Sequence, residues 1–98
     1  MTEGNLSEAY IQEQLKTIPG WTVKNGKLVR EFTFSDFVEA FAFMTELAIV
    51  SEKLDHHPEW LNVYNKLHIA LSTHDTGGLT EKDLEWATHC NQRYNQQM

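Results

Sequence analysis

The segment Trp21–Phe34, WTVKNGKLVREFTF, decides the fold of this chain. Its centre, Asn25-Gly26, is the strongest short-range signal for a β-hairpin, because both central residues of a type I′ turn need a positive φ angle. A two-residue loop at this point places four apolar residues on one face of the chain: Val23, Leu28, Phe32 and Phe34. The segment therefore predicts an antiparallel hairpin with one buried face.

A long helix is predicted after this hairpin, from Ser35 to about Lys53. We expect Ser35 to be its N-cap, and Asp36 is favourable near the positive end of the helix dipole. The apolar residues form two stripes, Phe37, Phe41, Met44 and Ala48 on one and Ala40, Phe43, Leu47, Val50 and Leu54 on the other. A helix on the surface of a small monomer needs an apolar face of roughly 100°. Because this face is wider, we expect a second subunit to cover the excess.

Two segments in the second half of the chain complete the sheet and add a helix. Strand-like alternation in WLNVYNKLHIALST (60–73) predicts a second hairpin. Asn65-Lys66 is the expected turn, but a strict two-residue loop there misaligns the apolar faces, so the register stays open. After Gly77-Gly78, Thr80 and Asp83 fit the capping box that opens a last helix. We expect that helix to bury Leu84, Ala87, Cys90 and Tyr94.

At the other end of the chain, a short amphipathic helix is predicted before the first hairpin. Its apolar residues are Leu6, Tyr10, Ile11, Leu15 and Ile18, and Pro19-Gly20 ends it. The order helix, hairpin, long helix, hairpin, helix predicts an α+β two-layer sandwich: a four-stranded antiparallel sheet with three helices packed on one face. A length of 98 residues predicts a single domain, residues 1–98.

Composition excludes several classes of function. The formal net charge is −6 and no cluster of lysine and arginine occurs, which argues against nucleic acid as a direct partner. No apolar run approaches the ~20 residues that cross a bilayer, and the polar, acidic start lacks the features of a signal peptide. The lone Cys90 cannot form an internal disulfide, as is usual in a reducing compartment. We therefore expect a cytoplasmic protein with no membrane partner.

Two adjacent histidines, His56 and His57, stand in the segment DHHPEW (55–60). If the third and fourth strands form a hairpin, the start of one and the end of the other lie at the same end of the sheet, which brings His74 close. Three readings stay open: an acid–base site, because imidazole titrates near neutrality, a metal site, and a polar loop. Three imidazoles and a water match a catalytic zinc site, although adjacent histidines rarely chelate one ion comfortably.

These residues resemble the signature of the pterin-4a-carbinolamine dehydratases. The matching segments are EKLDHHPEW (52–60), NVYNK (62–66) and LSTH (71–74), followed by Gly78 and Asp83. The resemblance extends from about Phe32 to Asp83. It implies a lyase that dehydrates 4a-hydroxytetrahydropterin to quinonoid dihydropterin by histidine acid–base catalysis, in tetrahydrobiopterin recycling. It implies no metal and no redox cofactor.

The resemblance also implies roles for single residues. His56 and His74 match the acid–base histidines of the family, and His57 matches a histidine that binds and orients the substrate. The substrate-binding residues implied beside these three are Glu52, Asp55, Trp60, Ser72, Thr73 and Asp83. For several of these residues a structural role is the alternative: a solvated helix end for Glu52, core packing for Trp60, and helix capping for Asp83.

The family further implies homo-oligomers, with dimers that extend the sheet and tetramers that bury helices. Some animal members also act as a dimerisation cofactor of a homeodomain transcription factor, and nothing in this sequence supports such a partner. The alternative function is therefore a non-enzymatic interaction module, in which the long helix binds a partner and the histidines are idle.

Overall fold

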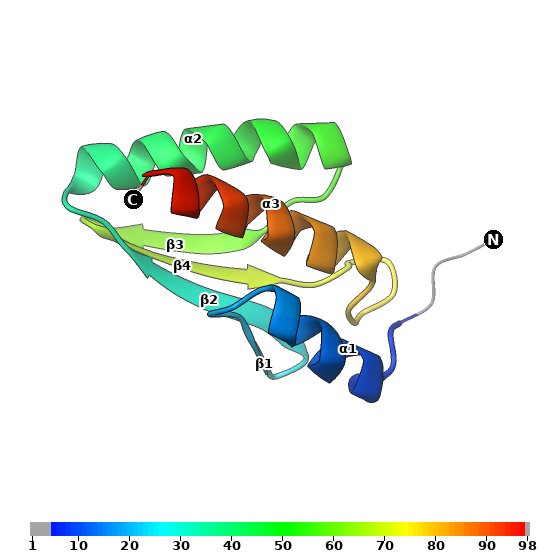
Figure 1. Ribbon diagram of the computed structural model, residues 1–98. Coiled ribbons are helices and arrows are strands. Elements are labelled where there is room, and N and C mark those ends of the chain that lie inside the picture. The colour runs from blue at the N-terminus through cyan, green and yellow to red at the C-terminus, as the bar shows by residue number, and fades with distance from the viewer. Residues whose placement is uncertain (1–4, 98) are drawn as a thin grey trace.

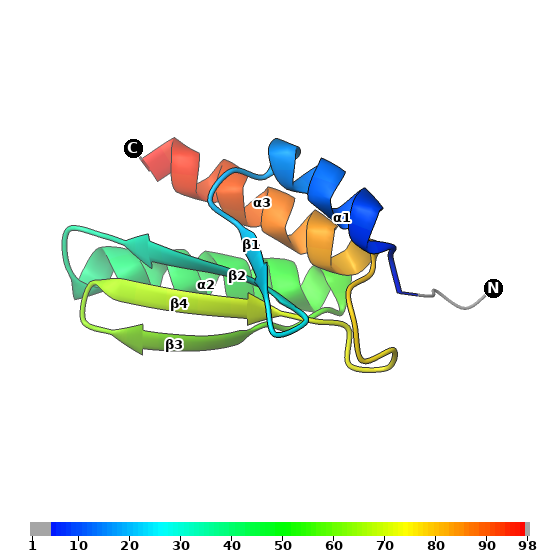
Figure 2. The same cartoon turned by 90° about the horizontal axis from the view of Figure 1, so that it is seen from below.

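A computed structural model describes residues 5–97 and has the predicted α+β architecture. The four strands form an antiparallel sheet of order β1-β2-β4-β3, with helices on one face. Helices α2 and α3 run side by side above the sheet in Figure 1, and α1 lies beside β1. Seen from below in Figure 2, the strands pass in front of α2. The polar start of the chain, residues 1–4, lies outside the described residues.

The elements follow the predicted order. They are α1 (Glu8–Gln14), the 3-10 helix η1 (Leu15–Thr17), β1 (Thr22–Lys24), β2 (Lys27–Thr33), α2 (Phe37–Leu54), β3 (Glu59–Val63), β4 (Lys66–Leu71) and α3 (Glu81–Gln97). The first predicted helix is thus shorter than expected, because its last turn tightens into η1 before Pro19. No helix among the described residues is long and apolar enough to cross a membrane.

The first hairpin has the predicted register. Val23 is paired with Leu28, and the two turn residues have positive φ angles, 54° at Asn25 and 77° at Gly26. Strand β2 then pairs with β4 from Leu28 to Thr33, so the two hairpins join in one sheet. As a result, alternate residues of β2 and β4 face the helices and form the floor of the core.

The second turn is at Tyr64-Asn65, one residue before the predicted position. Val63 and Lys66 form the closing pair, and Tyr64 takes the positive φ angle of 52°. The predicted turn was wrong because contacts outside the hairpin fix it: the Asn65 side chain donates to the Phe34 carbonyl (2.9 Å), and the Phe34 N–H donates to the Asn65 carbonyl (2.8 Å). With this turn, Trp60 lies opposite Ile69 and the apolar faces align.

Helix α2 also begins one residue later than predicted. Asp36, not Ser35, is the N-cap: its carboxylate accepts from the Glu39 N–H at 2.9 Å. The Glu39 carboxylate in turn accepts from the Ser35 N–H, also at 2.9 Å. Ser35 and Asp36 are both good caps, and the longer aspartate side chain satisfies the first turn while Glu39 reaches back.

The two apolar stripes of α2 have different surroundings. Ala40, Phe43 and Leu47 are fully buried against the sheet, as part of a core completed by Ile11, Ile18, Trp21, Leu28, Phe32, Phe34, Leu67, Ile69, Leu71, Leu79, Leu84, Trp86, Ala87 and Cys90. The other stripe is exposed except at Met44, which is half-buried against the core; Phe37 is 48% and Phe41 54% accessible. Exposed phenylalanines at neighbouring helical positions are the surface for which the sequence predicts a covering subunit.

Candidate active site

The C-terminus of α2 sets the direction of the two adjacent histidines. Asp55, the C-cap, adopts the left-handed conformation (φ 51°, ψ 47°), which aspartate tolerates better than most residues. The chain therefore turns back on the helix, and the His56 N–H donates to the Ser51 carbonyl at 3.0 Å. Asp55 itself is exposed, and among the described residues its side chain forms no hydrogen bond with a histidine. Its observed role is in the backbone.

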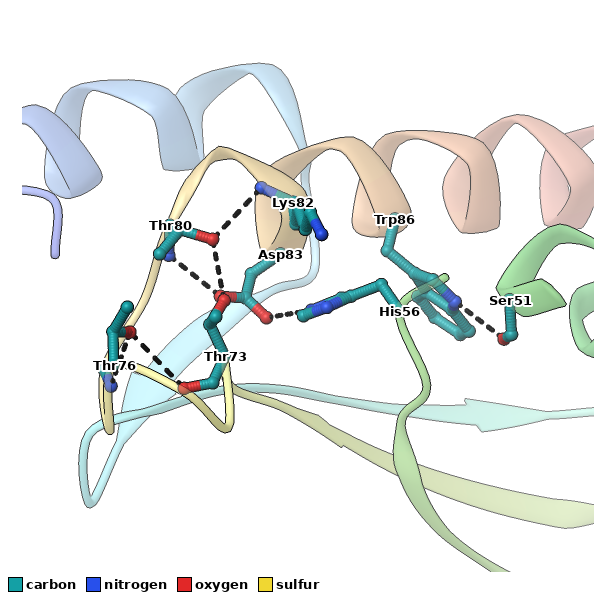
Figure 3. Close-up of polar contacts among 9 residues, drawn as sticks. Ser51, His56, Thr73, Thr76, Thr80, Lys82, Asp83 and Trp86 are labelled. Carbon is teal, nitrogen blue, oxygen red and sulfur yellow. Dashed lines mark hydrogen bonds and ion pairs between the residues drawn. The ribbon is translucent and has the colours of Figure 1, made fainter. Parts of the chain in front are cut away.

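His56 is buried and paired with a buried carboxylate. Its ring is 7% exposed, and its Nε2 lies 2.6 Å from Oδ1 of Asp83, which is fully buried in the first turn of α3 (Figure 3). The pair joins two elements, the α2–β3 loop and α3, that are far apart in sequence. A buried charged group needs such a partner, because an unpaired one costs several kcal/mol of desolvation.

The second oxygen of Asp83 is bound from two more segments. Oδ2 accepts from the Thr73 hydroxyl (2.8 Å) at the end of β4 and from the Thr80 N–H (2.9 Å). Thr80 Oγ1 in turn accepts from the Lys82 N–H at 3.3 Å, so the predicted capping box is present. Asp83 therefore has the structural role that the sequence favoured and also contacts the candidate histidine, because a cap at this helix start faces the α2–β3 loop.

His74 is the first residue of a tight loop after Thr73. The loop is closed by backbone hydrogen bonds from the Thr73 N–H to the Gly78 carbonyl (2.8 Å) and from the Gly77 N–H to the Thr73 carbonyl (2.9 Å). His74 is exposed, and Ser72 before Thr73 is half-buried. His74 thus directly follows a residue that binds the same carboxylate as His56. Its participation in one site with His56 stays a prediction.

His57 differs from its neighbour in every respect. It is 55% exposed, and its Nε2 lies 2.6 Å from Oε2 of Glu52, which is 79% exposed on the last turn of α2. Water screens such a pair, so it contributes little to stability. The two adjacent histidines therefore have separate carboxylates, one buried with His56 and one exposed with His57.

The buried side chains of Ser51 and Trp86, behind His56, were not among the predicted site residues. Trp86 is fully buried and donates its indole N–H to the Ser51 hydroxyl at 2.9 Å (Figure 3). Trp60 is half-buried and packs edge-on against Trp86, with ring centroids 6.3 Å apart. Trp60 thus makes a packing contact, and its contact with the pterin stays a prediction. The helical spacing of Trp86, between Asp83 and Cys90, was the available sequence signal for its burial.

Other chemistries have little support in the described residues. Burial raises the pKa of the Cys90 thiol, so its nucleophilic thiolate is scarce, as expected for a core residue. Among residues 5–97 no three His, Cys, Asp or Glu side chains are grouped so that they could hold one metal ion. The described residues do hold a buried histidine–carboxylate pair at the meeting point of three segments, and such a pair is chemically able to exchange a proton.

Comparison with known proteins places this chain in a family. Residues 4–93 match the family described as pterin 4 alpha carbinolamine dehydratase. The fold is that of an α+β protein with a buried histidine–carboxylate pair, and the match is more specific: the chain belongs to the pterin-4-alpha-carbinolamine dehydratase family, a family of lyases.

Individual relatives agree with this assignment. A protein of Solibacter usitatus (strain Ellin6076) named for this dehydratase is 56% identical over 82 residues, which cover 84% of this chain and 86% of the relative. One from Sinorhizobium medicae (strain WSM419) is 49% identical and covers 94% and 90%. A crystal structure from Brucella melitensis, described as a transcriptional coactivator/pterin dehydratase, superposes with a TM-score of 0.88 at 41% identity, covering 92% of this chain and 98% of that chain.

Proposed function

We propose that the chain dehydrates 4a-hydroxytetrahydropterin to quinonoid dihydropterin in tetrahydrobiopterin recycling. The observation that carries this proposal is the buried His56–Asp83 pair within a chain of this family. Dehydration requires an acid that protonates the hydroxyl oxygen on C4a, after which the C–O bond breaks and water leaves. The lone pair of the adjacent ring nitrogen forms the new C=N bond, and a base takes the proton of that nitrogen.

Histidine suits both proton transfers. Imidazole donates and accepts protons near neutral pH, and such catalysis contributes typically about 10²–10⁴-fold. In the proposal His56 and His74 share these two transfers, because one is fixed by Asp83 and the other follows Thr73, which binds Asp83 as well. His57, exposed and paired with Glu52, binds and orients the pterin.

A turnover assay tests the proposal. The purified protein is expected to accelerate dehydration of synthetic 4a-hydroxytetrahydropterin over the spontaneous rate, with the same rate after treatment with a metal chelator. The absorbance change of the pterin measures both rates. A rate equal to the spontaneous one would instead favour the interaction module, and a rate abolished by the chelator would favour a metal site.

We also propose that further copies of the chain cover its two open apolar surfaces. One is the exposed stripe of α2, with Phe37 and Phe41. The other is β3, an edge strand that exposes Leu61 (65%) and Val63 (63%). An unpaired edge with apolar side chains is a template for another strand. An apolar helix face can pack against the same face of a second subunit in a symmetric interface. Dimers through the edge and tetramers through α2 use both surfaces.

Light scattering at micromolar concentration tests this assembly. The wild-type mass is expected to be a multiple of the monomer mass, and Phe41→Glu is expected to lower it, because a charge in an apolar interface is costly to desolvate. Lys53→Gln is the matched control: it changes the net charge by the same amount on the polar edge of α2 and should leave the mass unchanged. A monomeric wild type would contradict the proposal.

A further inference from the structure

Two threonine hydroxyls form a chain of hydrogen bonds that ends on the Asp83 carboxylate, the partner of His56. Thr80 Oγ1 and Thr73 Oγ1 are 2.6 Å apart, and Thr73 Oγ1 is 2.8 Å from Asp83 Oδ2 (Figure 3). All three side chains are at least nine-tenths buried. Buried hydroxyls must find partners within the protein, so the direction of each bond can be worked out.

Each hydroxyl has one hydrogen, and this fixes the direction of the chain. Thr73 uses its hydrogen toward Asp83, so at the 2.6 Å contact Thr73 accepts and Thr80 donates. Thr80 accepts from the Lys82 N–H at 3.3 Å. If Thr73 donated to Thr80 instead, the hydrogen of the Thr80 hydroxyl would have no acceptor, and Asp83 Oδ2 would lose the donor Thr73. The chain therefore runs from the Lys82 N–H through Thr80 and Thr73 to Asp83.

The same accounting fixes the proton of His56. Asp83 Oδ2 already accepts from Thr73 and from the Thr80 N–H, and Oδ1 lies 2.6 Å from His56 Nε2. With the carboxylate as acceptor at both oxygens, the ring must donate from Nε2, which leaves Nδ1 for other chemistry. Among the described residues Nδ1 has no hydrogen-bond partner, and no buried side-chain nitrogen or oxygen lacks one. Nδ1 therefore reaches the protein surface.

We infer that Thr80 and Thr73 are positioning residues for His56, acting through Asp83 so that Nδ1 is the nitrogen that exchanges a proton with the substrate. This inference rests on the proposed dehydratase function and deepens it. It also removes the Thr73 hydroxyl from direct pterin binding, because its hydrogen and one lone pair are both engaged inside the protein.

Valine variants remove one hydroxyl each at nearly constant shape. Thr73→Val removes the hydrogen bond from Thr73 to Asp83 Oδ2. Thr80→Val removes the donor that orients the Thr73 hydroxyl, so this hydroxyl can turn and its hydrogen bond to Oδ2 is weakened. We expect kcat to fall about tenfold in either variant, a fraction of what acid–base catalysis supplies, with little change in KM. Because both act on one bond, the double variant should lose about as much as Thr73→Val alone.

The sharpest readout is the proton position on His56, measured by ¹⁵N NMR of the imidazole in the enzyme without substrate. The wild type should carry the proton on Nε2, and each valine variant should keep it there with a shifted Nε2–H resonance, because a carboxylate that has lost a donor at Oδ2 accepts more strongly from the ring. Thr80→Ser and Thr73→Ser should restore the wild-type spectrum and kcat. Thr88→Val is the matched control, since Thr88 lies on α3 and its hydroxyl donates only to the Leu84 carbonyl at 2.8 Å.

Several results would overturn the inference: a wild-type His56 with its proton on Nδ1, valine variants with unchanged spectrum and kcat, or serine variants that restore neither. Thermal unfolding of each variant sets a temperature at which all are folded, which separates a catalytic loss from a loss of cap stability. The spectrum does not depend on turnover. A wild type without dehydratase activity would therefore refute the proposed function, while the NMR spectrum would still test whether Thr80 and Thr73 act on His56 through Asp83.

Discussion

Replacing His56 with glutamine is expected to lower kcat for pterin dehydration by a factor of about 10²–10⁴, the usual contribution of a general acid or base. Glutamine is chosen because its amide N–H can still donate to Asp83, whereas it cannot exchange protons near neutral pH. Alanine would leave Asp83 Oδ1 without its partner, which costs about 1–3 kcal/mol of stability and would mix two effects. Steady-state kinetics together with thermal unfolding measure the result.

His89→Gln is the control for this substitution, because His89 is exposed on α3 and outside the site. His74→Gln tests the second histidine of the proposed pair and should also lower kcat, with less effect on stability since its ring is exposed. His57→Gln should act more on KM than on kcat. A His56→Gln enzyme with wild-type kcat would remove His56 from the mechanism, whatever the other two variants do.

The parts of the fold that sequence predicted are those fixed by local chemistry. Asn25-Gly26 needs only its own φ angles to make a type I′ turn, and the Thr80/Asp83 capping box needs only the first turn of α3. The second turn was placed one residue late because its position depends on two hydrogen bonds between Asn65 and Phe34, 31 residues apart in the chain. Periodicity along one segment contains no information about such a contact.

The candidate site, too, has features that the local sequence predicted and features that depend on tertiary contacts. The motif around His56 and His57 identified the residues, but not that they would separate into a buried ring on Asp83 and an exposed ring on Glu52. That separation follows from the left-handed Asp55, which turns the chain back toward Ser51, and from the packing of α3 over the α2–β3 loop. Both are consequences of tertiary structure. Thr80 was predicted as a cap only, since its contact with Thr73 requires β4 and α3 to be in place.

Asparagine at position 83 provides the strongest test of how the proton of His56 is directed. The amide has one acceptor oxygen, while Asp83 accepts from His56, Thr73 and the Thr80 N–H. The arrangement that satisfies most groups turns the amide oxygen toward the two threonines and the NH₂ group toward His56. Nε2 must then accept instead of donate, so the ring proton moves to Nδ1. The nitrogen proposed to face the substrate then lacks the lone pair with which it accepts a proton.

We expect Asp83→Asn to stay folded, with a stability loss of about 1–3 kcal/mol for the imperfectly paired amide. Its kcat should fall by at least about 10²; in serine proteases the equivalent carboxylate-to-amide change, which leaves the geometry intact but gives the wrong tautomer, costs about 10⁴. Imidazole ¹⁵N NMR should find the His56 proton on Nδ1. Glu85→Gln, an exposed change on the same helix, is the control and should affect neither kcat nor the spectrum. If Asp83→Asn kept the proton on Nε2 and still lost activity, Asp83 would act on the substrate directly and not through the histidine.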